Sequence, residues 1–142
     1  MTTKKSYRPT NFTFIEIMVV VIIIGVLAAI VLPKFTGRTE EARINAAENQ
    51  LGIFATALDA YELDNGRYPT TEQGLPALSK KPSSPPVPRR WKGPYLSKDI
   101  GQDPWGGNYV YKSPGIRNSR SYDLYSYGPD GKEGGDDDIT NW

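Results

Sequence analysis

The strongest constraint on this chain is an apolar stretch at residues 12–32, which reads FTFIEIMVVVIIIGVLAAIVL. Its 21 residues include one charged side chain, Glu16. A helix rises about 1.5 Å per residue, so a helical stretch of this length covers about 31 Å, close to the thickness of a bilayer's hydrocarbon core. The stretch therefore predicts a membrane-spanning helix. The carboxylate near its start indicates a second role, because a simple anchor gains nothing from a charge there.

Three interpretations of this stretch compete. A secretory signal peptide has an apolar core of about 7–15 residues followed by a cleavage site of small residues. The run here is longer, and residues 30–33 (IVLP) make a poor site of that kind. A plain anchor explains the length but not Glu16. The third interpretation places a processing site before the run, so that the whole run is retained.

The charges flanking the run predict its orientation. Residues 1–11 contain Lys4, Lys5 and Arg8 and no acid, whereas the remainder has 14 basic and 16 acidic residues. Because a short basic segment stays on the cytoplasmic side, we expect a cytoplasmic N-terminus and a C-terminal domain across the membrane. The basic residues gather on no helix or aromatic sheet face, which argues against nucleic-acid binding.

Two residue types are missing. The chain has no cysteine, so no disulfide cross-links its loops, and no histidine, which excludes the commonest general base and a histidine zinc site. No nucleophile–base pair or phosphate-binding loop stands out either. We therefore predict that the protein is not an enzyme.

Helical periodicity resumes after Pro33. Apolar side chains spaced three and four apart predict one buried helix face: Ile44, Ala47, Leu51, Phe54, Leu58 and Tyr61. We expect a long helix that runs to about Leu63 and ends at the Asp-Asn-Gly of residues 64–66.

The remaining segments predict a small sheet with long loops. Thr70 or Thr71 is expected to cap a short helix that ends near Ser79. Residues 91–96 are expected to pack on the core through their aromatic side chains. The other predicted elements are an exposed Pro-rich loop at 81–88, a tight turn at 103–107, strands at 108–112 and 121–126, and a hairpin loop at 114–119. The strands are expected to pair antiparallel and to pack on the helix.

An acidic loop follows the second strand. Residues 130–138 read DGKEGGDDD, with five carboxylates, three glycines and one lysine. A solvated acidic tail is the simple interpretation. Crowded carboxylates in a glycine-rich turn also suit a hard cation such as Ca²⁺, which takes about 6–8 oxygen ligands. The spacing is not that of an EF-hand, and composition alone leaves the two interpretations equally weighted.

The N-terminal motif resembles that of type IV pilins and type II secretion pseudopilins. The resemblance rests on a short basic leader, then Phe12-Thr13-Phe14-Ile15-Glu16 and an unbroken apolar run. Later stretches, at residues 63–75, 103–106, 126–131 and 137–142, are similar to the major pseudopilin family of type II secretion. Ordinary type IV pilins usually close their C-terminal region with a disulfide, which this chain lacks.

The resemblance implies an α+β, type IV pilin-like fold, with a long N-terminal helix packed on a small antiparallel sheet and a calcium-binding C-terminal loop. It divides the chain into a basic leader at 1–11, a transmembrane and assembly helix at 12–33, and a periplasmic globular domain at 34–142. It also implies cleavage by a prepilin peptidase between Asn11 and Phe12, followed by N-methylation of Phe12. Asn11 stands where the family has glycine.

The resemblance assigns roles to further residues. Glu16 is expected to pair with the amine of Phe12 on a neighbouring subunit; the alternative is that it reaches to the headgroups. Exposed charges such as Asp59 and Lys98 are expected to pair between subunits. The implied calcium ligands are the side chains of Asp130, Asp137 and Asp138 and the backbone carbonyls of Tyr127 and Gly135. Asp136 and Glu133 are further candidates for calcium ligands. With Asp136 as a ligand, the assignment of ligands shifts by one residue along the sequence.

The implied function is that of the major structural subunit of a type II secretion pseudopilus. The subunit waits in the inner membrane, in contact with lipid, and polymerises into a periplasmic fibre that drives export of folded proteins across the outer membrane. The implied partners are further copies of the chain, minor pseudopilins, the inner-membrane assembly platform and the prepilin peptidase. The alternatives are a type IV pilin for adhesion, motility or DNA uptake, and a plain membrane-anchored binding domain.

Overall fold

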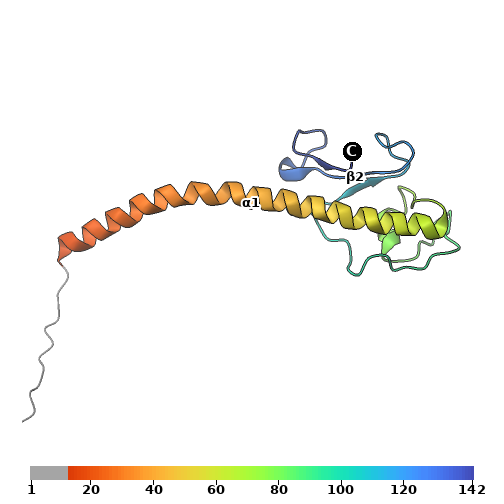
Figure 1. Ribbon diagram of the computed structural model, residues 1–142, viewed down its shortest axis with the longest axis horizontal. Helices are drawn as coiled ribbons and strands as arrows, with labels where there is room; N and C mark the ends of the chain where they lie inside the picture. Colours follow the sequence, from red (N-terminus) through yellow and green to blue (C-terminus); the bar gives the residue numbers. More distant parts are fainter. Residues whose placement is uncertain (1–12) are drawn as a thin grey trace, which may run out of the picture. The chain divides into compact units, whose positions relative to one another are not determined.

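The computed structural model describes residues 13–142, apart from the side chains of residues 30–37 (Figure 1). The predicted leader and cleavage site, with Asn11 and Phe12, lie outside the described residues. The chain divides into two units between Thr39 and Glu40. The elements in chain order are α1 (Phe14–Asn65), the 3₁₀ helix η1 (Leu75–Leu78), β1 (Val110–Lys112), β2 (Asp123–Ser126), the 3₁₀ helix η2 (Gly128–Asp130) and β3 (Ile139–Thr140).

The first unit contains the N-terminal part of α1. Thr13 directly precedes the helix, and its carbonyl and hydroxyl both accept a hydrogen bond from the Glu16 N–H in the first turn, at 3.1 and 3.3 Å. The apolar side chains that follow are exposed, from Phe14 at 80% to Leu27 at 57%. Among the residues that the structure describes, no helix combines the length and hydropathy that crossing a membrane requires.

The C-terminal part of α1 supplies the core of the second unit, as the periodicity predicts. Ala47, Leu51, Phe54, Leu58 and Tyr61 are all buried, and Ile44, at the start of the stripe, is half-buried. Aromatic rings from later segments pack edge-on against this face: Tyr109 against Phe54, with centroids 5.1 Å apart, and Tyr95 against Tyr61, at 5.6 Å.

The end of α1 also matches the prediction. Gly66 takes a left-handed conformation (φ 75°), and its N–H donates to the Glu62 carbonyl at 2.6 Å. Thr70 and Gln73 then form a reciprocal cap, in which the Gln73 N–H donates to Thr70 Oγ1 and the Thr70 N–H donates to Gln73 Oε1, each at 3.2 Å.

The predicted short helix is only one turn long. Gly74, with φ 58°, interrupts the turns that follow Thr70, so η1 begins at Leu75. The Pro-rich loop is mostly exposed, but Pro88 is buried and the Pro86 carbonyl accepts hydrogen bonds from Gln73 and Arg67. As predicted, the aromatic side chains of residues 91–96 pack against the core.

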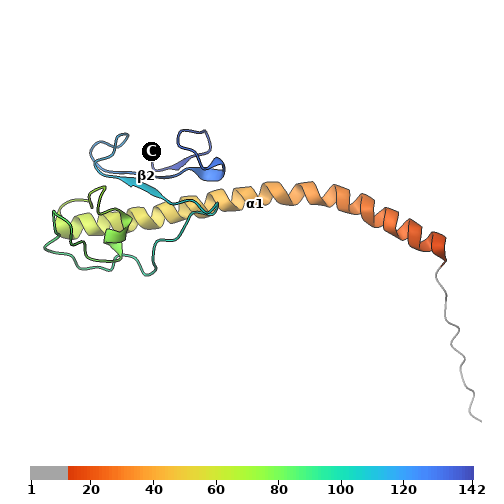
Figure 2. The same cartoon turned by 180° about the vertical axis from the view of Figure 1, so that it is seen from behind.

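The sheet is antiparallel, with strand order β1-β2-β3, and β2 lies beside α1 in both views (Figures 1 and 2). The register pairs Val110 with Tyr125 and Lys112 with Asp123, and it pairs Ser126 with Ile139. Both predicted strands start two residues too early, and β3 was not predicted. Core residues from α1 and from the strands form one cluster, so the α+β class and the packing of the sheet on the helix are confirmed.

Candidate metal loop and assembly residues

The acidic loop is folded by its own carboxylates. Asp130 Oδ1 accepts the Lys132 N–H at 2.8 Å, Asp137 Oδ2 accepts the Asp130 N–H at 3.1 Å, and Asp138 Oδ2 accepts the Gly134 N–H at 2.9 Å. The loop begins at Asp130, the last residue of η2, and ends at Asp138, directly before β3. The structure therefore brings the three predicted side-chain ligands into one closed loop.

Two glycines let the loop close tightly. A Cβ on Gly128 would overlap the backbone oxygen of Asp137, and a Cβ on Gly135 would overlap Asp137 Oδ1. The same point on Gly135 lies 3.7 Å from Asp130 Oδ2. The carboxylates of Asp130 and Asp137 therefore converge at the backbone of Gly135.

Of the two carboxylate oxygens of Asp138, one accepts a hydrogen bond and the other does not. Its Oδ2 bonds the Gly134 N–H, whereas its Oδ1 is buried and has no hydrogen-bond partner. A buried carboxylate oxygen without a donor is costly, and a bound cation removes that cost. The donor set here consists of oxygen atoms, which suits Ca²⁺.

Carboxylates alone do not complete a metal site here. Among the described residues, no three acidic side chains lie close enough together to hold a metal ion. A cation at this loop therefore needs backbone carbonyls as well as carboxylates. The family resemblance implies that role for Tyr127, which directly precedes η2, and for Gly135.

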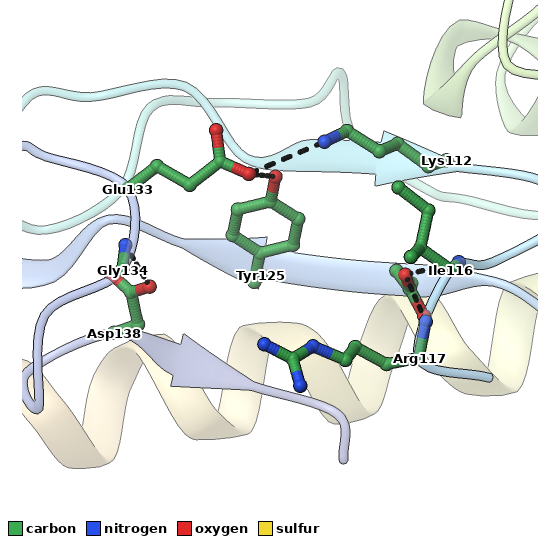
Figure 3. A network of polar contacts seen from close by, with 8 residues as sticks. Lys112, Ile116, Arg117, Tyr125, Glu133, Gly134 and Asp138 are labelled. Atoms are coloured by element: carbon green, nitrogen blue, oxygen red, sulfur yellow. Dashed lines mark hydrogen bonds and ion pairs between the residues drawn. The ribbon is translucent and has the colours of Figure 1, made fainter.

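Glu133 lies on the sheet side of the loop (Figure 3). Its Oε1 accepts a hydrogen bond from Tyr125 Oη at 2.9 Å and from Lys112 Nζ at 3.4 Å. These two donors, Tyr125 first, hold the pKa of Glu133 below its ordinary value. Sequence reasoning named Glu133 only as a further ligand candidate and missed these contacts.

A buried network ties the start of the loop to the turn at residues 103–107. Asp103, as predicted for a tight turn, accepts backbone N–H bonds at Oδ1 from Trp105 at 3.0 Å and Gly107 at 2.7 Å. Its Oδ2 accepts the Ser126 hydroxyl at 2.5 Å, and Ser126 Oγ in turn accepts the Gly128 N–H at 3.1 Å. The Asp-Pro-Trp-Gly motif signalled the turn but not its partner in β2.

The predicted assembly residues lie on exposed surface. Glu16 is exposed in the first turn of α1, and its expected partner Phe12 lies outside the described residues. Asp59 and Lys98 are both exposed, and Asp59 accepts a hydrogen bond from Tyr68 at 3.1 Å. Burial, together with hydrogen bonds to Glu62 and Asp59, raises the pKa of Tyr68 to about 12.

The chain is similar to proteins of one secretion system. A model of the family described as type II secretion system (T2SS), protein G, matches residues 34–142. The type II secretion system core protein G of Pseudomonas aeruginosa is 48% identical over 138 residues, covering 95% of this chain and 96% of that protein. The core protein G of Escherichia coli K12 is 47% identical over 135 residues, covering 95% and 92%.

A solved structure agrees with these relatives. The crystal structure of the major pseudopilin from the type 2 secretion system of enterohaemorrhagic Escherichia coli has a TM-score of 0.65 and 42% sequence identity. The match covers 75% of this chain and 92% of that chain. The chain therefore belongs to the type II secretion system protein G family.

Proposed function

We propose that the chain is the major structural subunit of a type II secretion pseudopilus, which polymerises into a periplasmic fibre and drives export of folded proteins across the outer membrane. Its relatives in the protein G family support this role. The observation that carries it is the exposed apolar surface of α1, where Ile22, Ile24 and Leu27 are each more than half exposed. So large an apolar surface needs lipid or other apolar helices around it.

Before assembly, the subunit resides in the inner membrane as a single-pass protein, with a cytoplasmic N-terminus and a periplasmic C-terminal domain. The basic leader and the length of the apolar run at 12–32 support this location. Lipid covers the apolar side chains until neighbouring helices replace it. Minor pseudopilins and the inner-membrane assembly platform are the further partners.

Processing precedes assembly in this proposal. A prepilin peptidase cleaves between Asn11 and Phe12 and methylates the new N-terminus. Mass analysis of the N-terminal peptide from membrane-extracted protein tests both steps, with a peptide that begins at methylated Phe12 as the expected result. An intact leader on fibre-forming protein would contradict this order of events.

Glu16 recruits subunits to the fibre through the amine of Phe12 on a neighbour. The test is complementation of a host that lacks its own major pseudopilin, with fibre formation and secretion measured together. We expect Glu16→Ala to abolish both, and Glu41→Ala, which removes another exposed carboxylate from the same helix, to leave both intact. Normal secretion by Glu16→Ala would refute the role of Glu16.

Calcium is the proposed ligand of the acidic loop, held by Asp130, Asp137 and Asp138 with the backbone carbonyls of Tyr127 and Gly135. The bound ion neutralises the crowded carboxylates and takes the place of the missing disulfide by stabilising only the folded loop. The partnerless Oδ1 of Asp138 and the convergence of two carboxylates at Gly135 support this proposal.

Thermal unfolding of the purified full chain tests the calcium proposal. We expect calcium to raise the Tm, EDTA to lower it, and Asp137→Asn to remove the difference. Asp99→Asn is the matched control, because Asp99 is exposed and lies outside the acidic loop. A wild-type Tm that does not respond to calcium would refute the site.

A further inference from the structure

We propose that Glu133 is a positioning residue that prepares the acidic loop for calcium without binding the ion itself. Glu133, Tyr125 and Lys112 form what we call the Glu133 clamp, which fastens the loop to β1 and β2. This inference rests on the proposed calcium site and assigns a role within it. The family resemblance offers Glu133 only as a further ligand candidate, whereas the clamp gives it a role outside the ligand set.

The clamp starts from a rigid part of the sheet. Tyr125 lies in the middle of β2 and is 3% exposed. Its ring packs edge-on against Tyr127 and Trp142, with centroids 5.7 and 5.4 Å away. Lys112 lies on β1 with Nζ 5.6 Å from the centre of the Tyr125 ring. A hydroxyl on so constrained a ring is a fixed point, and the 2.9 Å bond from it holds Glu133 in one place.

The next residue transmits this position to a proposed ligand. Gly134 follows Glu133 directly, and its N–H donates to Asp138 Oδ2 at 2.9 Å. That bond orients the Asp138 carboxylate and leaves Oδ1 buried and without a partner. Because Glu133 is held in place, the neighbouring Gly134 N–H is held too. That N–H in turn orients the Asp138 carboxylate.

The direction of the Glu133 side chain argues against direct coordination. In Figure 3 its carboxylate points toward the Tyr125 hydroxyl and Lys112 and away from Asp138. Both hydrogen bonds that it accepts go to Oε1 and come from the sheet. Glu133 is therefore placed to orient a metal ligand without touching the metal. Substitution of such a residue typically weakens metal affinity about 10- to 100-fold.

Calcium titration calorimetry on the purified full chain tests the proposal with three clamp variants and one control variant. We expect Glu133→Ala and Tyr125→Phe each to weaken calcium binding about tenfold, because each breaks the clamp. The double variant should bind no more weakly than Glu133→Ala alone, since both residues act through one contact. Tyr125→Phe changes no charge, so its effect separates positioning from attraction between charges. Glu72→Ala, which removes an exposed carboxylate elsewhere, should bind like the wild type.

The results of these titrations separate a failure of the clamp from a failure of the calcium site. Loss of affinity in Glu133→Ala with none in Tyr125→Phe would make Glu133 a ligand and overturn the clamp. Equal losses of calcium affinity in Glu133→Ala and Glu72→Ala would show that net charge alone causes the effect, and they would also overturn the clamp. A wild type that binds no calcium would refute the site and the clamp together.

Amide hydrogen exchange in EDTA gives a metal-free check, because breaking the clamp should make the Gly134 N–H exchange about tenfold faster; unchanged exchange would count against the clamp.

Discussion

Gly128 and Gly131 offer a matched test of how tightly the acidic loop is closed. Both glycines have a left-handed backbone, with φ of 64° and 67°. A Cβ on Gly128 would overlap the backbone oxygen of Asp137, whereas a Cβ on Gly131 would meet nothing within 4 Å. Alanine at either position carries the same cost of a left-handed backbone, so the difference between the two variants isolates the steric overlap.

The expected difference in Tm between the two variants follows from two free-energy costs, that of the left-handed backbone and that of the steric overlap. A left-handed conformation costs a non-glycine residue about 1–2 kcal/mol, and this applies to both variants. The overlap in Gly128→Ala is with backbone, which cannot rotate away, and forcing extra atoms into a closed site typically costs about 1–3 kcal/mol more. In a domain of this size, 1 kcal/mol lowers the Tm by about 4–8 °C. We therefore expect the Tm of Gly128→Ala to lie at least about 4 °C below that of Gly131→Ala.

The assay is thermal unfolding followed by near-ultraviolet circular dichroism, with and without calcium. The Tyr and Trp side chains around the sheet report on the fold directly, because Tyr125, Tyr127 and Trp142 pack against one another beside the loop. Calcium should raise the Tm of Gly131→Ala more than that of Gly128→Ala, since only the second variant displaces the backbone of Asp137. Equal melting temperatures for the two variants would refute the closure described here.

Three further predictions concern the rest of the second unit. Leu58→Ala, at a fully buried position, should lower the free energy of unfolding by about 2–5 kcal/mol in urea titrations. Tyr111→Phe should cost about 1 kcal/mol, because the buried Pro69 carbonyl loses its 2.8 Å hydrogen bond. Burial raises the pKa of Asp123, but N–H donors from residues 116–118 outweigh it and hold that pKa below its ordinary value. The stability from this carboxylate is present above about pH 3.9 and lost as pH falls through the lower folded pKa, so wild type should lose more stability than Asp123→Asn between pH 5 and pH 2.

The helix and its core were predictable because the signal is local and repeated. Five apolar side chains of the stripe at helical spacing are buried, and Gly66 ends the helix with the backbone geometry that glycine favours. The strands were harder. Residues 108–112 alternate in side-chain size, but pairing begins only at Val110. β3 has two residues, too few for any periodicity to show.

The candidate site was predictable only in part, for the same reason. Asp130, Asp137 and Asp138 are near one another in sequence, and each accepts a backbone hydrogen bond within the loop, although their three side chains do not gather closely enough to hold a metal ion without other ligands. The Glu133 clamp depends instead on the sheet register, which pairs Lys112 with Asp123 and so places Lys112 diagonally across from Tyr125. No spacing within one segment encodes that neighbour. The bond between Ser126 and Asp103 likewise joins residues 23 positions apart.

The exposed apolar part of α1 has a consequence for how such helices recognise one another. Its described side chains, from Phe14 to Leu27, are apolar on every side of the helix except at Glu16, and Gly25 has no side chain. Apolar attraction has no direction, so a neighbour gains nearly the same contact area at many rotations and many axial offsets. A surface of this kind supplies adhesion and leaves the relative position of two helices undetermined. In the proposed fibre, one carboxylate among apolar side chains is enough to remove that degeneracy, because only one offset brings it to the positive amine proposed as its partner.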